Sequence, residues 1–318
     1  MNYVKKLLRS KGIYIILFIT ILVIILVFSL LQIRNSKRVE FLTIQNNYSH
    51  INDDTNPLAV QVNCSRNDTM YFNKKLVKNC TFIDYENYDS FVVELVDISK
   101  QSKNLSHKNE NYYSYRLLFK FPFSSNDIIV LNNFYLNIEY INDEKIVLPM
   151  GSLALATNSY SGTDIIISSM QGIVNRNNEN DTLVGIVLRP TSLTKNIQII
   201  DIKAISSVVE VNLDEVEEIN NKTIINNELM EEILGKEYDI YNYIPSTKLN
   251  SPIEINSQYI LPLMYKKSQI ITTIGLVIKY LNNDVEFEQI VYPFKFFSGT
   301  ETVDIKKTIY GWNPFRKC

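Results

Sequence analysis

An apolar stretch from Gly12 to Ile33 constrains this chain more than any other feature, because basic residues flank it and no later segment is apolar enough to span a bilayer. As a helix rising about 1.5 Å per residue, this stretch covers roughly the 30 Å hydrocarbon core of a membrane. We therefore predict that residues 12–33 form a transmembrane signal anchor in the lipid bilayer. A cleavable signal peptide is disfavoured, because the apolar region is too long and Ser29-Leu30-Leu31-Gln32 lacks the small-x-small cleavage pattern.

The basic residues around this stretch predict its orientation. The stronger cationic flank of a first helix usually stays in the cytoplasm. Four basic residues precede the stretch and three follow it: Lys5, Lys6, Arg9 and Lys11 before, Arg34, Lys37 and Arg38 after. We predict a single-pass protein of the cell membrane, with residues 1–11 as a cytoplasmic tail and the body outside the cell.

The part of the chain after the anchor is acidic and large enough for two domains. The whole chain of 318 residues has a formal charge of −2, and residues 1–39 hold seven basic and no acidic side chains, so the remainder carries −9. An acidic body does not bind nucleic acid or anionic lipid through bulk charge. About 280 residues outside the membrane correspond to two domains of ordinary size.

Residue patterns after the anchor predict a mostly β protein. The polar, Asn-rich segment 34–59 has little periodicity and is interpreted as a stalk. Three later runs of β-branched and aromatic residues predict strands: Phe91–Val96, Tyr115–Phe121 and Phe134–Tyr140. One short helix is expected over Asn227–Leu234, where apolar residues share a face and Gly235 follows as a C-terminal cap.

An internal repeat with an offset of about 140 residues suggests that the body consists of two similar halves. Phe121-Pro122-Phe123 matches Leu261-Pro262-Leu263, and the strand ending at Tyr140 matches the one around Tyr280. Turn residues follow each of these strands, and Ser-Gly-Thr recurs in the same order. A biased composition is the alternative source of such matches. We predict two tandem β-sandwich domains of immunoglobulin-like character, over 60–178 and 181–318, the second a possible duplicate of the first.

Two cysteines in the predicted outer body are candidates for a disulfide. Cys64 and Cys80 would close a loop of about 15 residues, and such a bridge contributes about 3 kcal/mol by restricting the unfolded chain. Two buried thiols are the alternative. Cys318, the last residue given, has no obvious partner.

No catalytic, metal or cofactor motif stands out, so we expect a protein that is not an enzyme and holds no cofactor or metal. His50 and His107 fall in polar segments and are interpreted as solvated loop residues. Nucleophile and phosphate-binding loop patterns are missing from the sequence. The acidic run of Asp214, Glu215, Glu217 and Glu218 lacks the spacing of a calcium loop.

Clustered tyrosines are the only candidate binding residues. Tyrosine offers rigid contact area with a polar tip, which suits a glycan platform or a protein-binding hot spot. Cross-strand pairing within a sheet is the alternative use. The candidates are Tyr112, Tyr113, Tyr115, Tyr238, Tyr241 and Tyr243.

These patterns together predict a non-catalytic binding or adhesion protein on the cell surface, with a protein partner or surface ligand. One alternative is a structural subunit of an envelope secretion or conjugation assembly. The stretch Ile13–Leu31 gives this no support, because it has neither a small-xxx-small seam nor a buried charge. A second alternative is an envelope enzyme with an unfamiliar site.

Overall fold

The computed structural model describes most of the chain outside its two ends. The described residues are 18–27, 29, 39–52, 56–67, 70–122, 128–157, 162–177, 180–194, 196–219, 230–245, 248–266, 273–295 and 305–310. Within the expected anchor, residues 18–27 and 29 are helical, and the rest of 12–33 lies outside this set. Among the described residues, no helix combines the length and the apolar character needed to cross a membrane.

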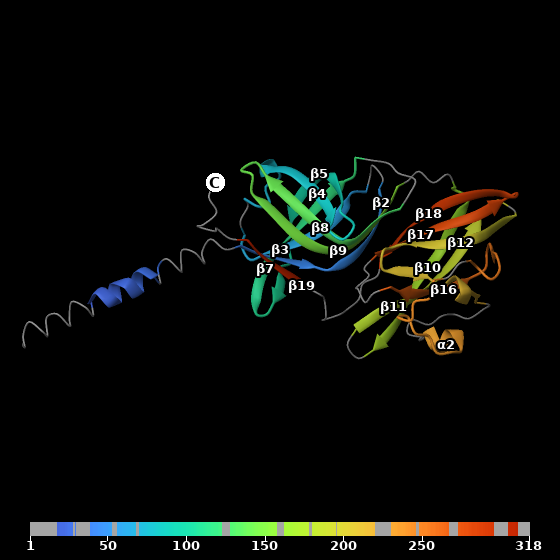
Figure 1. Ribbon diagram of the computed structural model, residues 1–318. Helices are drawn as coiled ribbons and strands as arrows, with labels where there is room; N and C mark the ends of the chain where they lie inside the picture. Colours follow the sequence, from blue (N-terminus) through green and yellow to red (C-terminus); the bar gives the residue numbers. More distant parts are fainter. Residues whose placement is uncertain are drawn as a thin grey trace, which may run out of the picture.

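The described body is mostly β, as the sequence predicts (Figure 1). The strands of the first half are β1 (Val39–Ile44), β2 (Asn46–Asn52), β3 (Leu58–Cys64), β4 (Val77–Asp84), β5 (Asp89–Lys100), β6 (Leu105–His107), β7 (Glu110–Lys120), β8 (Ile129–Tyr140) and β9 (Lys145–Thr157). Those of the second half are β10 (Ile165–Asn177), β11 (Asn180–Ser192), β12 (Ile197–Ile205), β13 (Val209–Val211), β14 (Glu217–Glu218), β15 (Ile253–Glu254), β16 (Tyr259–Tyr265), β17 (Thr273–Asn282), β18 (Val285–Lys295) and β19 (Ile305–Tyr310). The helical elements are η1 (Lys74–Leu76), η2 (Leu213–Glu215) and α2 (Met230–Leu234).

One ten-stranded sheet forms the first unit, which we define as β1 to β9 together with β19. Its order is β19-β1-β3-β7-β5-β4-β8-β9-β2, with β6 beside β7. The long strand β5 pairs with β4 through Asp89–Val93 and with β7 through Glu94–Lys100, so it joins two parts of the sheet. Side chains of those two parts meet in the core, where the rings of Phe82 and Phe119 lie 5.1 Å apart.

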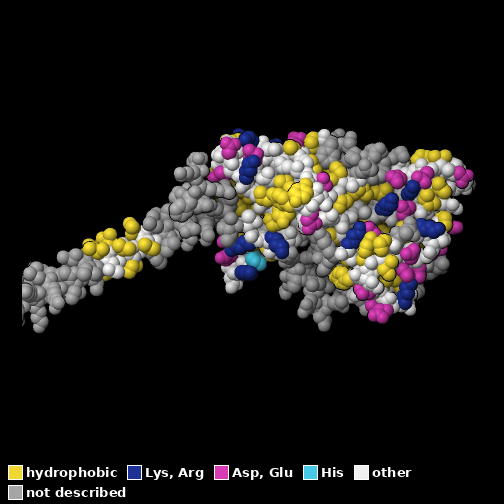
Figure 2. All heavy atoms as spheres, viewed as in Figure 1, with side chains coloured by type: hydrophobic (Ala, Val, Ile, Leu, Met, Phe, Trp, Pro, Cys, Tyr) yellow, Lys and Arg dark blue, Asp and Glu magenta, His cyan; other side chains and the backbone are white. Residues whose placement is uncertain are grey.

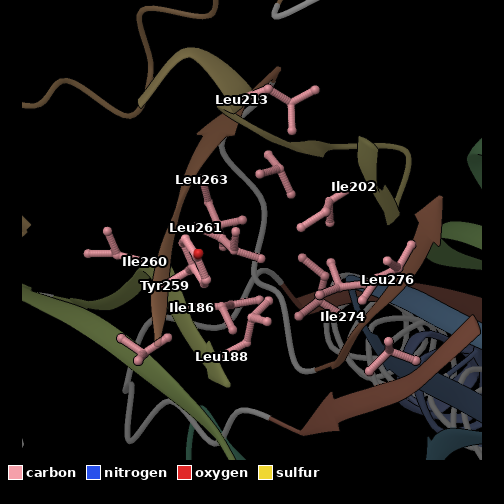
Figure 3. Close-up of a cluster of buried hydrophobic side chains, with 14 of the residues drawn as sticks. Ile186, Leu188, Ile202, Leu213, Tyr259, Ile260, Leu261, Leu263, Ile274 and Leu276 are labelled. Carbon is pink, nitrogen blue, oxygen red and sulfur yellow. The ribbon is translucent and has the colours of Figure 1, made fainter. Parts of the chain in front are cut away.

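Two smaller sheets form the second unit, which we define as β10 to β18 together with α2. Their orders are β10-β11-β16-β13, with β14 beside β16, and β15-β12-β17-β18. Figure 3 shows apolar side chains of both sheets pointing toward one another, including Leu188 and Leu261 from one and Ile202 and Leu276 from the other. This shared core holds the two sheets together.

The two units contact each other through β2. The backbone N–H of Gly275 on β17 donates to the Ser49 hydroxyl at 2.9 Å, and the backbone N–H of Ser49 donates to the Thr273 hydroxyl at 3.3 Å. A Cβ added at Gly275 would lie 3.2 Å from the Ser49 hydroxyl oxygen, so the absence of a side chain permits this close approach. A small apolar cluster, with Ile51 from the first unit and Val277 from the second, completes the contact.

The structure corrects the stalk expected over 34–59. Residues 39–52 form β1 and β2 and are buried or half-buried: β1 lies between β3 and β19, and β2 pairs in parallel with β9. The polar composition misled the interpretation because the Asn47 side chain is buried, where its carbonyl oxygen accepts the hydroxyls of Ser152 at 3.0 Å and Ser207 at 3.4 Å. Partners far away in the sequence thus bond the Asn47 carbonyl oxygen, an acceptor that otherwise needs water.

Strand pairing also departs from the expected halves at two points. β10 lies within 60–178 but pairs with β11 of the second unit. β19 lies within 181–318 but pairs with β1, and Figure 1 shows it among the strands of the first unit, away from β17 and β18. The last strand of each expected half therefore belongs to the other unit.

Two hairpins correspond at the repeated tyrosines. Tyr140 is the last residue of β8 and Tyr280 lies near the end of β17, and both side chains are buried. Tyr140 is paired with Val77 and Tyr280 with Ile199, and in both units the register shifts at the next position. Such bulges are local and defined features of a strand. The following turns use residues with positive φ: Asp143 in the first unit, and Asn283 and Asp284 in the second.

Candidate binding surfaces

A single buried carboxylate organises the turn between β4 and β5. Asp84 ends β4 and is fully buried. Its Oδ1 accepts the backbone N–H of Glu86 at 2.9 Å, and its Oδ2 accepts the backbone N–H of Asn132 at 2.7 Å. The side-chain amide of Asn87 also donates to Oδ2, at 3.2 Å. One side chain therefore shapes the turn and attaches it to β8.

Two exposed tyrosines project from this turn, which we call the tyrosine tip (Tyr85–Asp89). Tyr88 is 90% exposed, and the ring of Tyr85, 51% exposed, lies 5.0 Å from that of Tyr135 in an edge-to-face arrangement. Tyr88 has a φ of 58°, a left-handed conformation that is uncommon for a bulky residue and costs about 1–3 kcal/mol. The hydrogen bonds of Asp84 hold the turn in this conformation. The tip is thus an aromatic surface that faces solvent on a turn anchored by Asp84.

Tyr85 and Tyr88 of the tyrosine tip are not among the binding tyrosines predicted from the sequence. Their spacing does not set them apart, because Tyr85 and Tyr88 are three residues apart, as Tyr238 and Tyr241 are, but they lie in the polar run Asp84–Asp89. The available signal was their place in that run, between β4 and the strand predicted at Phe91–Val96. A turn has no opposing strand to cover an aromatic ring, so aromatic residues in a polar turn favour an exposed position.

The first predicted group of tyrosines lies on β7 and is largely buried. The Tyr112 hydroxyl donates to a carboxylate oxygen of Glu110 at 2.6 Å, and a carboxylate oxygen of Glu40 lies 3.1 Å away and shares the same proton. Burial, and then these hydrogen bonds, raise the pKa of Tyr112 above its ordinary value. Tyr115 stacks on Phe72 in the core, with ring centroids 3.7 Å apart.

Of this group, Tyr113 is half-buried, and the Lys100 amine lies 4.7 Å from its ring centroid. The burial of Tyr112 and Tyr115 therefore favours the alternative, a role in packing within the sheet, over a role in binding.

The second predicted group lies on the second unit and is more accessible. Tyr241 is 53% exposed, while Tyr238 is half-buried and donates its hydroxyl to the Leu263 carbonyl at 3.1 Å. The Tyr243 hydroxyl donates to Glu210 at 2.6 Å, and burial followed by this bond raises its pKa to about 12. Glu210 also forms an ion pair with Lys266. Tyr241 is the member of this group that offers the most surface to a partner.

The expected disulfide is absent, since Cys64 and Cys80 are buried thiols and are not bridged. Their positions in the sheet explain this result. Cys64 ends β3, whereas Cys80 lies on β4 between Val93 and Ile138, and β7 and β5 separate the two strands. Burial raises the pKa of the Cys80 thiol to about 12, so it stays protonated and unreactive at neutral pH. Cys318 lies outside the described residues.

The interpretation of His50 as a solvated loop residue was wrong. It lies on β2, is buried, and its ring centroid is 5.8 Å from that of Phe121. His107 ends β6 and is half-buried. Among the described residues, no group of three or more His, Cys, Asp or Glu side chains is placed to hold a metal ion.

The described part of the acidic run lies on η2 and β14. Asp214 and Glu215 belong to η2, and Glu215 forms an ion pair with Lys236. Glu217 and Glu218 form β14 and are exposed. This arrangement is that of an ordinary solvated segment.

The visible face of the body is mixed in character. Figure 2 shows separate apolar patches with positive and negative side chains scattered between them. Binding on this face would therefore depend on local contacts rather than on one large charged surface.

No family model and no curated protein matches this chain. Among solved structures, a crystal structure of the YadV chaperone aligns with 79% of this chain and 98% of its own length. The sequence identity is 8% and the TM-score is 0.18, and a similarity this low supports no conclusion about fold or function.

Proposed function

We propose that this chain is a membrane-anchored, non-catalytic binding protein whose two β units lie outside the cell and contact a protein partner or surface ligand. The apolar stretch 12–33 and its basic flanks support the anchor and the orientation. The tyrosine tip is the observation that carries the binding role.

We further propose that each unit is an immunoglobulin-like sandwich. In that fold, strands A, B, E and D form one sheet in this order, and C, F and G form the other. In the first unit β1, β3, β7 and the second half of β5 have the order A-B-E-D, and β4, β8 and β9 have the order C-F-G. In the second unit β10, β11, β16 and β13 match the first set, and β12, β17 and β18 match the second.

Gene duplication is the proposed origin of the two units. The support is the position of two register shifts. One comes directly after Val77 of β4, which pairs with Tyr140, and the other directly after Ile199 of β12, which pairs with Tyr280. Bulges are kept within protein families, so a shared bulge beside a shared tyrosine favours common descent over compositional coincidence.

The tyrosine tip suits binding because the hydrogen bonds of Asp84 anchor the turn that presents its two rings. Rigid aromatic side chains supply contact area at low entropic cost, and Tyr is enriched among the residues that dominate binding energy. Tyr85 and Tyr88 supply that area, while the exposed carboxylates of Glu86 and Asp89 form a polar and acidic rim. A partner with an apolar contact region and basic neighbours fits this surface best.

Capture of partners from native membranes tests the proposal. Tagged full-length protein and the variant Tyr88→Asn are compared, because Asn tolerates the left-handed conformation of residue 88 but lacks the aromatic ring. Tyr241→Asn is the matched control, since it removes an exposed tyrosine from the second unit. The proposal expects one partner that is lost with Tyr88→Asn and kept with Tyr241→Asn. Equal capture by all three proteins contradicts a role for the tip.

A further inference from the structure

Natural β proteins protect the edges of their sheets, because an open edge carries unpaired N–H and C=O groups that bind other strands. Protection comes from short length, charged residues, proline or cover by another element. The described sheets end in six strands: β19, β2, β10, β13, β15 and β18.

Five of these edges are protected. β13 and β15 are short, with three and two residues. β2 is covered by the second unit through the hydrogen bonds of Ser49. The other two edge strands carry charges or proline: Lys306 and Lys307 on β19, and Glu286, Glu288 and Pro293 on β18.

β10 is long, uncharged and free of proline over most of its length, and no other described strand covers its outer edge. It has 13 residues, and Ile165–Asn175 includes neither a charged residue nor a proline. Among the described strands it pairs with β11 alone. The carboxylate of Asp164, just before the strand, is bonded to β17, where it accepts the Tyr280 hydroxyl at 2.9 Å and the Asn282 amide at 3.2 Å.

The part of this edge that can pair with another strand is a short regular segment. At its start, the Gln289 side chain bonds both the N–H and the C=O of Ile165 and so caps that position. Register shifts interrupt the strand at Ile167/Ser169 and at Ile173/Val174. Between them, Ser169–Ile173 pairs regularly with β11. Alternate residues of such a segment direct their N–H and C=O groups away from β11.

We propose that this edge binds β10 of a second copy of the chain, forming an antiparallel pair around a two-fold axis at Gln171. A two-fold axis places each residue of the segment against a residue of the same segment, and like charges in that arrangement would repel. The absence of charge over Ile165–Asn175 removes that penalty. The inference depends on strand pairing alone and is independent of the proposed binding role.

β19 of a second copy fits this edge less well than β10 does. On β1, Lys307 is matched by Glu40, whose carboxylate lies 2.5 Å from the lysine amine. Ile165–Asn175 contains no carboxylate that would take the place of Glu40. The neutral edge therefore matches itself better than it matches a basic strand.

Exposed apolar side chains at one end of the β10–β11 hairpin enlarge the surface available to a second copy. Ile166, opposite Thr191, is 51% exposed, and Leu193, just after β11, is 94% exposed. Removing these two apolar side chains from water would favour association with a second copy.

The mass of the full-length protein in mild detergent tests the proposal. Wild type is expected to be a dimer. Gln171→Lys places two lysines against each other at the two-fold axis and should halve the mass, whereas Ser102→Lys, on an exposed loop of the first unit, should not. A wild-type monomer, or a dimer that survives Gln171→Lys, overturns the proposal, and the second outcome places the contact elsewhere.

Oxidative cross-linking tests the register and does not depend on the lysine variants folding. Gln171→Cys is introduced together with Cys318→Ser, and paired Cα atoms about 4.5–5.5 Å apart lie within disulfide range. A covalent dimer is expected for this protein but not for Ser102→Cys in the same background. Cross-linking of Gln171→Cys in one chain to Lys306→Cys in another, in place of the 171–171 bond, would show that the edge takes β19 and would overturn the two-fold pair.

Discussion

Replacing Asp84 tests the physical basis of the tyrosine tip. In Asp84→Ala, the backbone N–H groups of Glu86 and Asn132 and the amide of Asn87 all lose their acceptor. Hydrogen bonds to a charged group contribute about 1.5–3 kcal/mol each, so three of them amount to more than about 4.5 kcal/mol. The variant also removes a carboxylate that is costly to bury, which offsets part of this loss. We expect a net loss of about 3 kcal/mol in the free energy of unfolding of the first unit.

Urea-dependent hydrogen exchange, read by mass spectrometry on the full-length protein in detergent, measures this loss. Peptides from β4 and β8 report on the first unit and peptides from β17 on the second, so the two free energies are separated. Asp84→Asn, which keeps one acceptor oxygen but places an NH₂ group near backbone donors, should lose about 2 kcal/mol. Asp89→Ala, on the exposed side of the turn, should stay within about 0.5 kcal/mol of wild type. An equally small loss for Asp84→Ala would refute the reasoning.

Three further predictions concern the packing of the two units. Gly275→Ala brings a methyl group to about 3.2 Å from the Ser49 hydroxyl oxygen and should loosen the contact between units, measured as faster exchange of the β2 amides with little change at β4. Cys64 and Cys80 should react with an alkylating reagent only after unfolding and without any reductant; alkylation that requires reductant would restore the disulfide. Burial raises the pKa of Tyr280 to about 12 from an ordinary 10. The folded chain therefore holds this proton more tightly than the unfolded chain, and stability should fall as pH rises from about 10 to 12. Tyr280→Phe should show a shallower fall over this range, and an unchanged slope would contradict the assignment.

Strand positions were predictable from the sequence because their pattern is local. Phe91–Val96 and Phe134–Tyr140 lie within β5 and β8, and Tyr115–Phe121 overlaps β7 except for its last residue. The one short helix is also present over the described part of its range, with Gly235 at a φ of 68° just after it. Apolar alternation and cap residues act over a few neighbours, so one sequence is enough to recognise them.

Buried polar strands were not predictable, because distant residues decide their burial. β2 contains Asn47, Ser49 and His50 and resembles a solvated segment when taken alone. The Asn47 carbonyl oxygen and the Ser49 hydroxyl accept hydrogen bonds from partners more than 100 residues away, Ser152 and Gly275. Local composition contains no trace of such partners.

The candidate site was predicted by residue type but not by position. Tyrosine was the expected binding residue, yet Tyr115 is buried because Phe72, more than 40 residues earlier in the chain, stacks on it. Tyr88 is exposed because its turn leaves it no neighbour to cover the ring. Clustering in the sequence is therefore a poor guide to exposure in a β protein, where facing strands determine which rings are covered.

Site-specific photo-cross-linking from residue 88 in intact cells tests the central claim most directly. A photoreactive phenylalanine analogue replaces Tyr88 in one strain and Tyr241 in another, and a membrane-impermeant label marks products that lie outside the cell. The account predicts one discrete cross-linked partner from position 88, labelled on the outside and missing from position 241. No product at position 88, the same product from both positions, or a product shielded from the label in intact cells would contradict it.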